Sequence, residues 1–214
     1  MTTEHDYART LADTLERAEG AGSWDWLFLP LLRLLANGEP VTVAEIAAAT
    51  GRTTAEVEQA LAASPSIERD EHDRIVGGGL TLRPTPHRFE LDDGPRLYTW
   101  CALDTLFFPA VLGRTAHVES PCHGTGAPVR LTVTPTDVTG LDPTGAVVSL
   151  VTPDDASHIR ASFCDQVHFF ASADAAAPWL RDHPEASVLP VPEAYDLGRE
   201  LARHLQHGIP PSGC

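Results

Sequence analysis

The sequence predicts an α+β fold, with an N-terminal winged-helix-like helical module packed on a larger core of mainly antiparallel strands. Helix start and stop signals are concentrated in the first 80 residues, and short alternating apolar segments begin near Leu80. The chain of 214 residues is long enough to bury one large core or two small ones. We therefore expect one domain over residues 1–80 and a second over residues 81–214.

The first expected helices are apolar and end at recognisable signals. One amphipathic stretch covers residues 7–18, and a second covers Trp24–Leu35 and stops at Asn37-Gly38, a pair typical of helix ends. Pro30 should kink this second helix or mark its true beginning, because proline lacks the N–H that a helix interior requires.

Two capping boxes follow. Thr42 with Glu45 and Thr53 with Glu56 each place a hydroxyl three residues before a glutamate, and Gly51 separates the two segments. Two short helices around a tight glycine turn form a helix-turn-helix, and the segment from 67 to 76 is typical of a small hairpin. The module is therefore predicted to be winged-helix-like.

Beyond Leu80 the pattern favours strands. Thr115–Glu119 and Val129–Thr134 alternate in polarity around a tight turn over residues 121–126, and Gly145–Val151 follows an Asp-Pro-Thr-Gly turn. One short helix is expected near residues 178–181 and a longer one over residues 191–206. This half is therefore α+β.

Charge excludes several classes of function. The formal net charge is −15, and the chain has no lysine, which removes Schiff-base chemistry and a P-loop. Residues 1–80 hold 14 acidic and 6 basic side chains, and the expected recognition helix, from Thr54 to Ala62, carries Glu56 and Glu58 without arginine. A polyanion would be repelled, so we expect no nucleic-acid partner and a module that packs on the rest of the protein.

The termini and cysteines indicate a reducing compartment. The N-terminus is acidic and polar, without the pattern of a secretory signal, and no apolar run is long enough to cross a bilayer, so we expect a cytoplasmic protein without membrane contact. Cysteines at 101, 122, 164 and 214 are widely spread and should stay reduced, which favours a metal or catalytic role over disulfides. We expect no role for Cys214.

Cys101 and Asp104 are the main candidate site residues. They lie in the apolar run Tyr98–Pro109, and if this run is helical, positions i and i+3 share a face. A buried carboxylate requires a partner, because burying it charged and unpaired is costly. Cys164 lies in a second apolar and aromatic segment, Ala161–Phe170. Two thiols and a carboxylate in apolar surroundings indicate soft-metal chemistry with a proton to move.

Five segments of the chain match a known family in order and spacing: Arg96–Leu106, Gly113–Ala116, Thr125–Val129, Ser162–Cys164 and His168–Ser172. They resemble the organomercurial lyases, the alkylmercury-cleaving enzymes of bacterial mercury resistance. The likeness extends upstream through Leu80–Leu82 into the helical module, and so covers nearly the whole chain.

The resemblance implies that Cys101, Asp104 and Cys164 are the catalytic residues and the mercury ligands, on a catalytic α+β core. It implies no organic cofactor, organomercurials as substrates, and Hg(II) as a product cleared by external thiols or by a mercuric reductase. Cys122 matches a cysteine of the family, and the resemblance implies a structural rather than a catalytic role for it. Asp165 stands where some members carry a further cysteine, so we assign no ligand there.

The residue types suit protonolysis of a carbon–mercury bond. Thiolates are the donors a soft metal prefers, and a metal-bound thiol loses its proton. An ordinary aspartate, with a pKa near 3.9, is rarely protonated at pH 7 and cannot serve as a waiting acid unless burial raises its pKa. Asp104 is therefore expected to accept the proton of a metal-binding thiol and to deliver it to carbon. Trp100, Phe107, Phe163 and Phe169 could shape a pocket for the organic group or simply form core.

Three other interpretations remain open at this point. A metal-responsive transcription regulator would combine the winged helix with a thiol sensor. A structural zinc site could use Cys164 with His168, or Cys122 with His123, although paired ligand motifs are absent. A cysteine–histidine hydrolase is also conceivable, because the chain has 10 histidines.

Overall fold

The structure is a computed structural model that describes residues 24–64, 66–152 and 159–207, together with five residues near the N-terminus (Tyr7, Thr10, Leu11, Asp13 and Thr14). Those five residues are helical. The rest of the helix predicted over residues 7–18 lies outside the described residues, as does Cys214.

The N-terminal helices begin where the sequence predicts. Helix α2 (Leu29–Leu35) carries Pro30 in its first turn, where a missing N–H leaves no hydrogen bond unmade, and a π-helix, η1 (Trp24–Phe28), precedes it. Helices α3 (Val43–Thr50) and α4 (Thr54–Ala62) start at the two predicted capping boxes. Gly51 closes α3 in the left-handed region, with φ of 68°.

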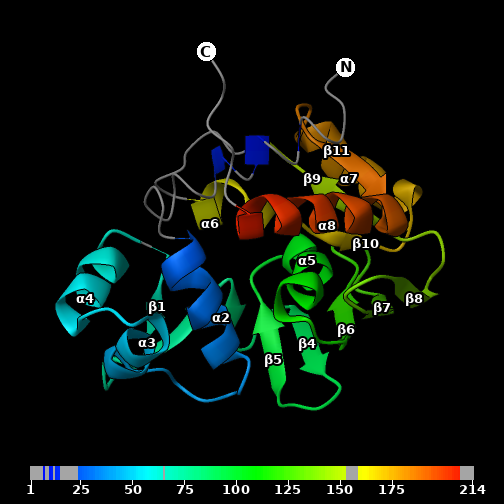
Figure 1. Ribbon diagram of the computed structural model, residues 1–214. Helices are drawn as coiled ribbons and strands as arrows, with labels where there is room; N and C mark the ends of the chain where they lie inside the picture. Colours follow the sequence, from blue (N-terminus) through cyan, green and yellow to red (C-terminus); the bar gives the residue numbers. More distant parts are fainter. Residues whose placement is uncertain are drawn as a thin grey trace.

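A small hairpin completes the module. Strand β1 (Glu68–Arg69) pairs antiparallel with β2 (Ile75–Gly78), and Ile75 also bridges to Val41 ahead of α3. The helix-turn-helix with a wing is therefore confirmed. Figure 1 shows α3 and α4 beside this hairpin, away from the central helix α5.

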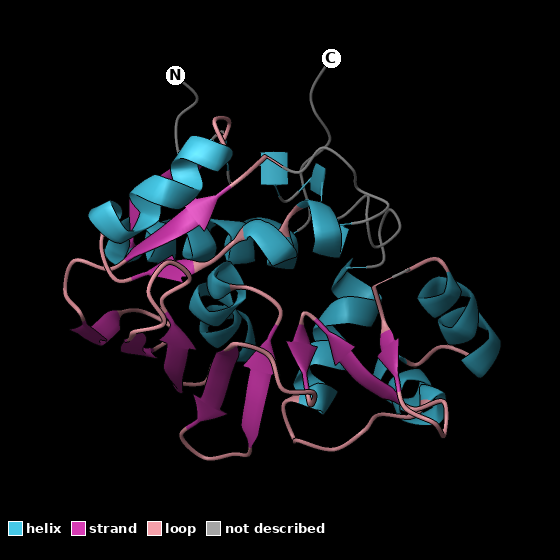
Figure 2. Ribbon diagram, turned by 180° about the vertical axis from the view of Figure 1, so that it is seen from behind, coloured by secondary structure: helices cyan, strands magenta, loops and turns pink. Residues whose placement is uncertain are grey.

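The hairpin is the edge of a larger antiparallel sheet. This sheet has eight strands in the order β1-β2-β3-β5-β4-β6-β7-β8. The further strands are β3 (Leu80–Thr81), β4 (His87–Leu91), β5 (Arg96–Thr99), β6 (Ala116–Pro121), β7 (Pro128–Val133) and β8 (Val138–Asp142). Figure 2 shows its strands in a row beneath the central helices. Strand β3 spans the expected boundary between residues 80 and 81, so the division into two domains stays a prediction.

A second sheet and the C-terminal helices lie on the other side of α5. Strand β9 (Val147–Leu150) pairs with both β10 (Phe169–Phe170) and β11 (Ser187–Pro190). Helix α7 (Ala173–Asp182) is longer than the predicted short helix, and α8 (Val191–His207) agrees with prediction. Helix α5 (Ala102–Leu112) packs between the larger sheet and α8 (Figure 1).

The condition that the run Tyr98–Pro109 be helical holds only from Ala102 onward. Residues up to Thr99 form strand β5, whose backbone pairs with β3 and β4, and α5 starts only at Ala102. Sheet pairing across the chain outweighs the local apolar pattern, which cannot distinguish a buried strand from a buried helix. The first candidate cysteine therefore stands at the junction of a strand and a helix.

Candidate active site

The structure brings Cys101, Asp104 and Cys164 together. One ligand atom from each, two Sγ atoms and a carboxylate oxygen, lie within 4.8 Å of one another. All three residues are buried, with exposed fractions of 0%, 8% and 6%. They form the one group of three or more potential metal ligands found in the described part of the chain.

The first two residues are placed by the start of α5. Cys101 is the N-cap residue, in an extended conformation, and Asp104 is the third residue of the helix. The Cys101 N–H donates a hydrogen bond of 3.1 Å to Oδ2 of Asp104, and the Thr99 hydroxyl donates to the Cys101 carbonyl. The carboxylate thus caps the helix end, where the unpaired N–H groups favour negative charge.

The second thiol reaches this helix end through a backbone link. Cys164 opens a short 3₁₀ helix, η3 (Cys164–Gln166), which follows α6 (Ile159–Ser162). The Ala102 N–H, at the first turn of α5, donates a 3.0 Å hydrogen bond to the Val167 carbonyl. The Ser149 hydroxyl, on β9, donates to the Gln166 carbonyl. The first of these bonds joins segments that lie far apart in the chain.

Burial dominates the charge state of Asp104. Removal from water raises the pKa of this carboxyl group from 3.8 to about 7, although hydrogen bonds from Cys101 and the charge of Arg160 act in the opposite direction. At neutral pH the group is therefore divided between its acid and its carboxylate forms. An aspartic acid in this state can both accept and donate a proton.

Both thiols are held in the protonated form. Burial, followed by a hydrogen bond involving Cys164, raises the pKa of Cys101 well above its ordinary value. The hydrogen bond from Cys101 lowers the pKa of Cys164, but burial and the Asp104 carboxylate outweigh it, so this pKa is also raised. The thiols can therefore bring protons into the site and release them when a metal binds.

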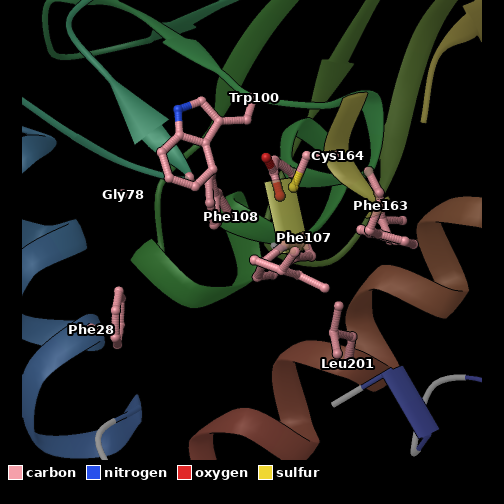
Figure 3. A pocket seen from close by; sticks show the side chains of 12 residues that line it. Phe28, Gly78, Trp100, Phe107, Phe108, Phe163, Cys164 and Leu201 are labelled. Carbon is pink, nitrogen blue, oxygen red and sulfur yellow. The ribbon is translucent and has the colours of Figure 1, made fainter. Parts of the chain in front are cut away.

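An apolar cavity adjoins Asp104 and Cys164. Its volume of about 40 Å³ exceeds the roughly 10–15 Å³ that one water molecule needs. Figure 3 shows Trp100 and Cys164 near each other at one end, with Phe28 and Leu201 toward the other. Its apolar wall comes from both halves of the chain and includes Phe28, Phe107, Phe108, Ile159, Phe163 and Leu201.

Of the four aromatic residues considered for the pocket, three line the cavity and one does not. Trp100, Phe107 and Phe163 line the cavity. Phe169 is instead fully buried beside His87, with ring centroids 6.2 Å apart, and so belongs to the core. Phe28 and Leu201 were not predicted, since nothing in their local sequence distinguishes them from other core residues.

The other candidate residues lie outside the cluster. His168 stacks on His123 with ring centroids 3.9 Å apart, and neither histidine joins the three-ligand group. Cys122 is buried in the turn after β6, where its carbonyl accepts hydrogen bonds from Thr125 and Gly126. The side chain of Asp165 is 57% exposed. The described residues thus give no support to the predicted zinc alternatives.

One charged contact was missed by the sequence analysis. The guanidinium of Arg160, on α6, lies 4.7 Å from the Trp100 ring centroid and forms an ion pair with Glu68 of the wing. Nothing in the sequence around Arg160 distinguishes it from the other arginines, so its contacts with Trp100 and Glu68 could not be predicted.

Two buried thiols and a carboxyl group beside an apolar cavity are the groups that a protein handling a soft metal with an apolar organic group would need. A sequence model of the family described as alkylmercury lyase matches residues 80–203, and one described as the helix-turn-helix domain of alkylmercury lyase matches residues 6–79. The chain therefore belongs to the alkylmercury lyase family of enzymes.

Individual relatives agree with this assignment. An alkylmercury lyase of Streptomyces lividans is 58% identical over 97% of this chain and 96% of its own length. One of Staphylococcus epidermidis is 54% identical over 100% and 98%. A solved structure, the mercury-bound form of MerB2, is similar with a TM-score of 0.78 and 28% identity, covering 93% of this chain and 98% of the other.

None of the described helices is long and apolar enough to span a membrane.

Proposed function

We propose that this enzyme cleaves the carbon–mercury bond of organomercurials by protonolysis, with Cys101, Asp104 and Cys164 as its catalytic residues. The observation that carries the proposal is the 4.8 Å cluster of two protonated thiols and one carboxyl group beside an apolar cavity. Thiolate sulfur suits mercury, and the apolar wall suits the organic group.

Proton balance supports this arrangement. A substrate in which mercury is bonded to a carbon group and an external thiolate meets two enzyme thiols. Each thiol loses one proton as its sulfur bonds to mercury. One proton leaves with the external thiol, and the other goes to carbon as the carbon–mercury bond breaks. The products are a hydrocarbon, a free thiol and Hg(II) bound by Cys101 and Cys164.

Asp104 is the group that moves the proton. Its carboxyl oxygen is close to both sulfur atoms, and its pKa of about 7 lets it accept a proton from a thiol and return it to carbon at neutral pH. An ordinary aspartate would hold that proton too weakly to be present when carbon needs it.

Product release completes the cycle. External thiols, or a mercuric reductase, would remove Hg(II) from the two sulfur ligands, so the enzyme would serve mercury detoxification. This scheme uses no organic cofactor, since the chain's own residues bind the metal and carry the proton. It requires reduced cysteines, which favours a location in the cytoplasm.

Hydrocarbon release tests the proposal. Purified enzyme with excess thiol is given methylmercury or phenylmercury, and methane or benzene is measured. We expect the product from the wild type and from Cys122→Ala, whose cysteine is buried outside the cluster, but not from Cys101→Ala. Tight Hg(II) binding without any hydrocarbon from the wild type would overturn the proposal and leave a mercury-binding protein.

A further inference from the structure

A partly buried ion pair connects the N-terminal wing to the cavity. The Glu68 side chain on β1 is only 11% exposed, and its Oε1 pairs with Nη1 of Arg160, which lies 92 residues further along the chain. Its other oxygen accepts a 2.6 Å hydrogen bond from the Thr81 hydroxyl. A Cβ at Gly77 would lie 2.2 Å from that oxygen, so glycine leaves the space that the carboxylate occupies.

The Glu68 carboxylate holds the guanidinium against a wall of the cavity. Arg160 lies over the face of Trp100, with 4.7 Å between the guanidinium carbon and the ring centroid. Trp100 lines the cavity and is 7% exposed, yet its indole N–H has no hydrogen-bond partner among the described residues. The orientation of this ring therefore depends on packing and on the arginine.

We propose that Glu68 is a positioning residue for substrate binding: by holding Arg160 on Trp100, the wing of the helix-turn-helix module fixes the cavity wall that receives the organic group. The inference rests on the proposed function of this site. The proposal gives the N-terminal module a role within the enzyme. Nucleic acid is an unsuitable partner for this module, because its net charge is negative.

Removal of the Glu68 charge changes what Arg160 can contact. Among the described residues, the other carboxylate that forms an ion pair with Arg160 is Asp165, 4.0 Å from its Nε and 57% exposed, so the guanidinium would turn toward solvent and leave the indole. The cavity wall then loses its cation–π contact, whereas the thiols and Asp104 keep their places on α5 and η3. Substrate binding should therefore weaken more than the chemical step.

Steady-state kinetics with methylmercury test this difference. We expect Glu68→Gln to raise KM by about tenfold, the size of a partly exposed cation–π contact, with kcat within roughly threefold of wild type. Asp70→Asn is the matched control: Asp70 lies in the same hairpin, is 12% exposed and pairs with Arg74 at 2.7 Å, but does not line the cavity. It should leave KM unchanged.

A double variant shows whether Glu68 acts through Arg160. If it does, the double variant Glu68→Gln with Arg160→Met should have the same KM as Arg160→Met alone. Once Arg160 is replaced, the ion pair with Glu68 is already lost, so Glu68→Gln has no further effect. Multiplying effects, or a KM for Glu68→Gln equal to that of Asp70→Asn, would overturn the inference. If Glu68→Gln does not fold, Arg160→Met, whose side chain is 40% exposed, must itself raise KM.

Equilibrium binding of methylmercury to the same variants separates this inference from the proposed function. A wild type that binds methylmercury without releasing methane refutes the lyase proposal. The affinity ratio between wild type and Glu68→Gln then still decides the positioning role: a ratio near ten supports it, and a ratio near one refutes it.

Discussion

Replacement of Asp104 by asparagine should stabilise the protein, and increasingly so as the pH rises. In the folded protein the pKa of this carboxyl group is about 7, whereas in the unfolded chain it is near 3.9. Between these values the folded state holds a proton that the unfolded state has released, so the free energy of unfolding falls as pH rises. At about 1.36 kcal/mol per pH unit, the loss is complete above the folded pKa and amounts to about 4 kcal/mol.

The Asp104→Asn variant would be free of this penalty, since the new amide is uncharged and its oxygen can still accept the Cys101 N–H. We expect its excess stability over wild type to grow from about 1.5 kcal/mol at pH 5 to about 4 kcal/mol at pH 8. Urea unfolding under reducing conditions measures it. Asp165→Asn, at an exposed site, should show no such trend. An excess stability that does not change with pH, or an asparagine variant less stable than wild type at pH 8, would refute this account of Asp104.

Further predictions concern turnover, the backbone and nucleic acid. Cys101→Ala and Cys164→Ala should each abolish hydrocarbon release, and retained turnover in either would remove that thiol from the mechanism. Asp104→Ala should still bind methylmercury but lose about 10²–10⁴-fold in kcat, as measured by methane release, and full activity would exclude a proton relay. Gly79→Ala should cost roughly 1–3 kcal/mol in urea unfolding, because φ is +85° and the new Cβ would lie 2.9 Å from the Phe108 ring. An unchanged unfolding midpoint would contradict that strain. In gel-shift titrations at several salt concentrations, the protein should form no salt-dependent complex with DNA, because its recognition helix α4 carries two glutamates. A salt-dependent complex would support the alternative hypothesis of a transcription regulator.

Local signals predicted the N-terminal module well. Each of its helix signals affects only residues within one helical turn. These signals are the capping boxes of Thr42 and Thr53, the proline in the first turn of α2 and the glycine that closes α3. Such interactions depend on neighbours in the chain and are therefore readable from it. The same reasoning found the wing hairpin and helix α8.

The apolar run around Cys101 shows where local reasoning fails. Its hydrophobic pattern is compatible with a helix throughout, but pairing with β3 and β4 makes residues 96–99 a strand. The proximity of Cys101 and Asp104 does not depend on a helix throughout, because an N-cap residue and the third residue of a helix also face each other across three positions. The residue types and their spacing, with the family resemblance, were enough to name the three candidate site residues.

The sequence by itself thus determined the short-range elements, the acidic charge that disfavours nucleic acid, and the residues proposed for catalysis. Only the tertiary structure decided that Cys164 meets Cys101, that burial raises the pKa of Asp104, and that Glu68 reaches the cavity through Arg160. These properties arise from contacts between distant segments and from exclusion of water. Both depend on how the whole chain packs, so no local pattern contains them.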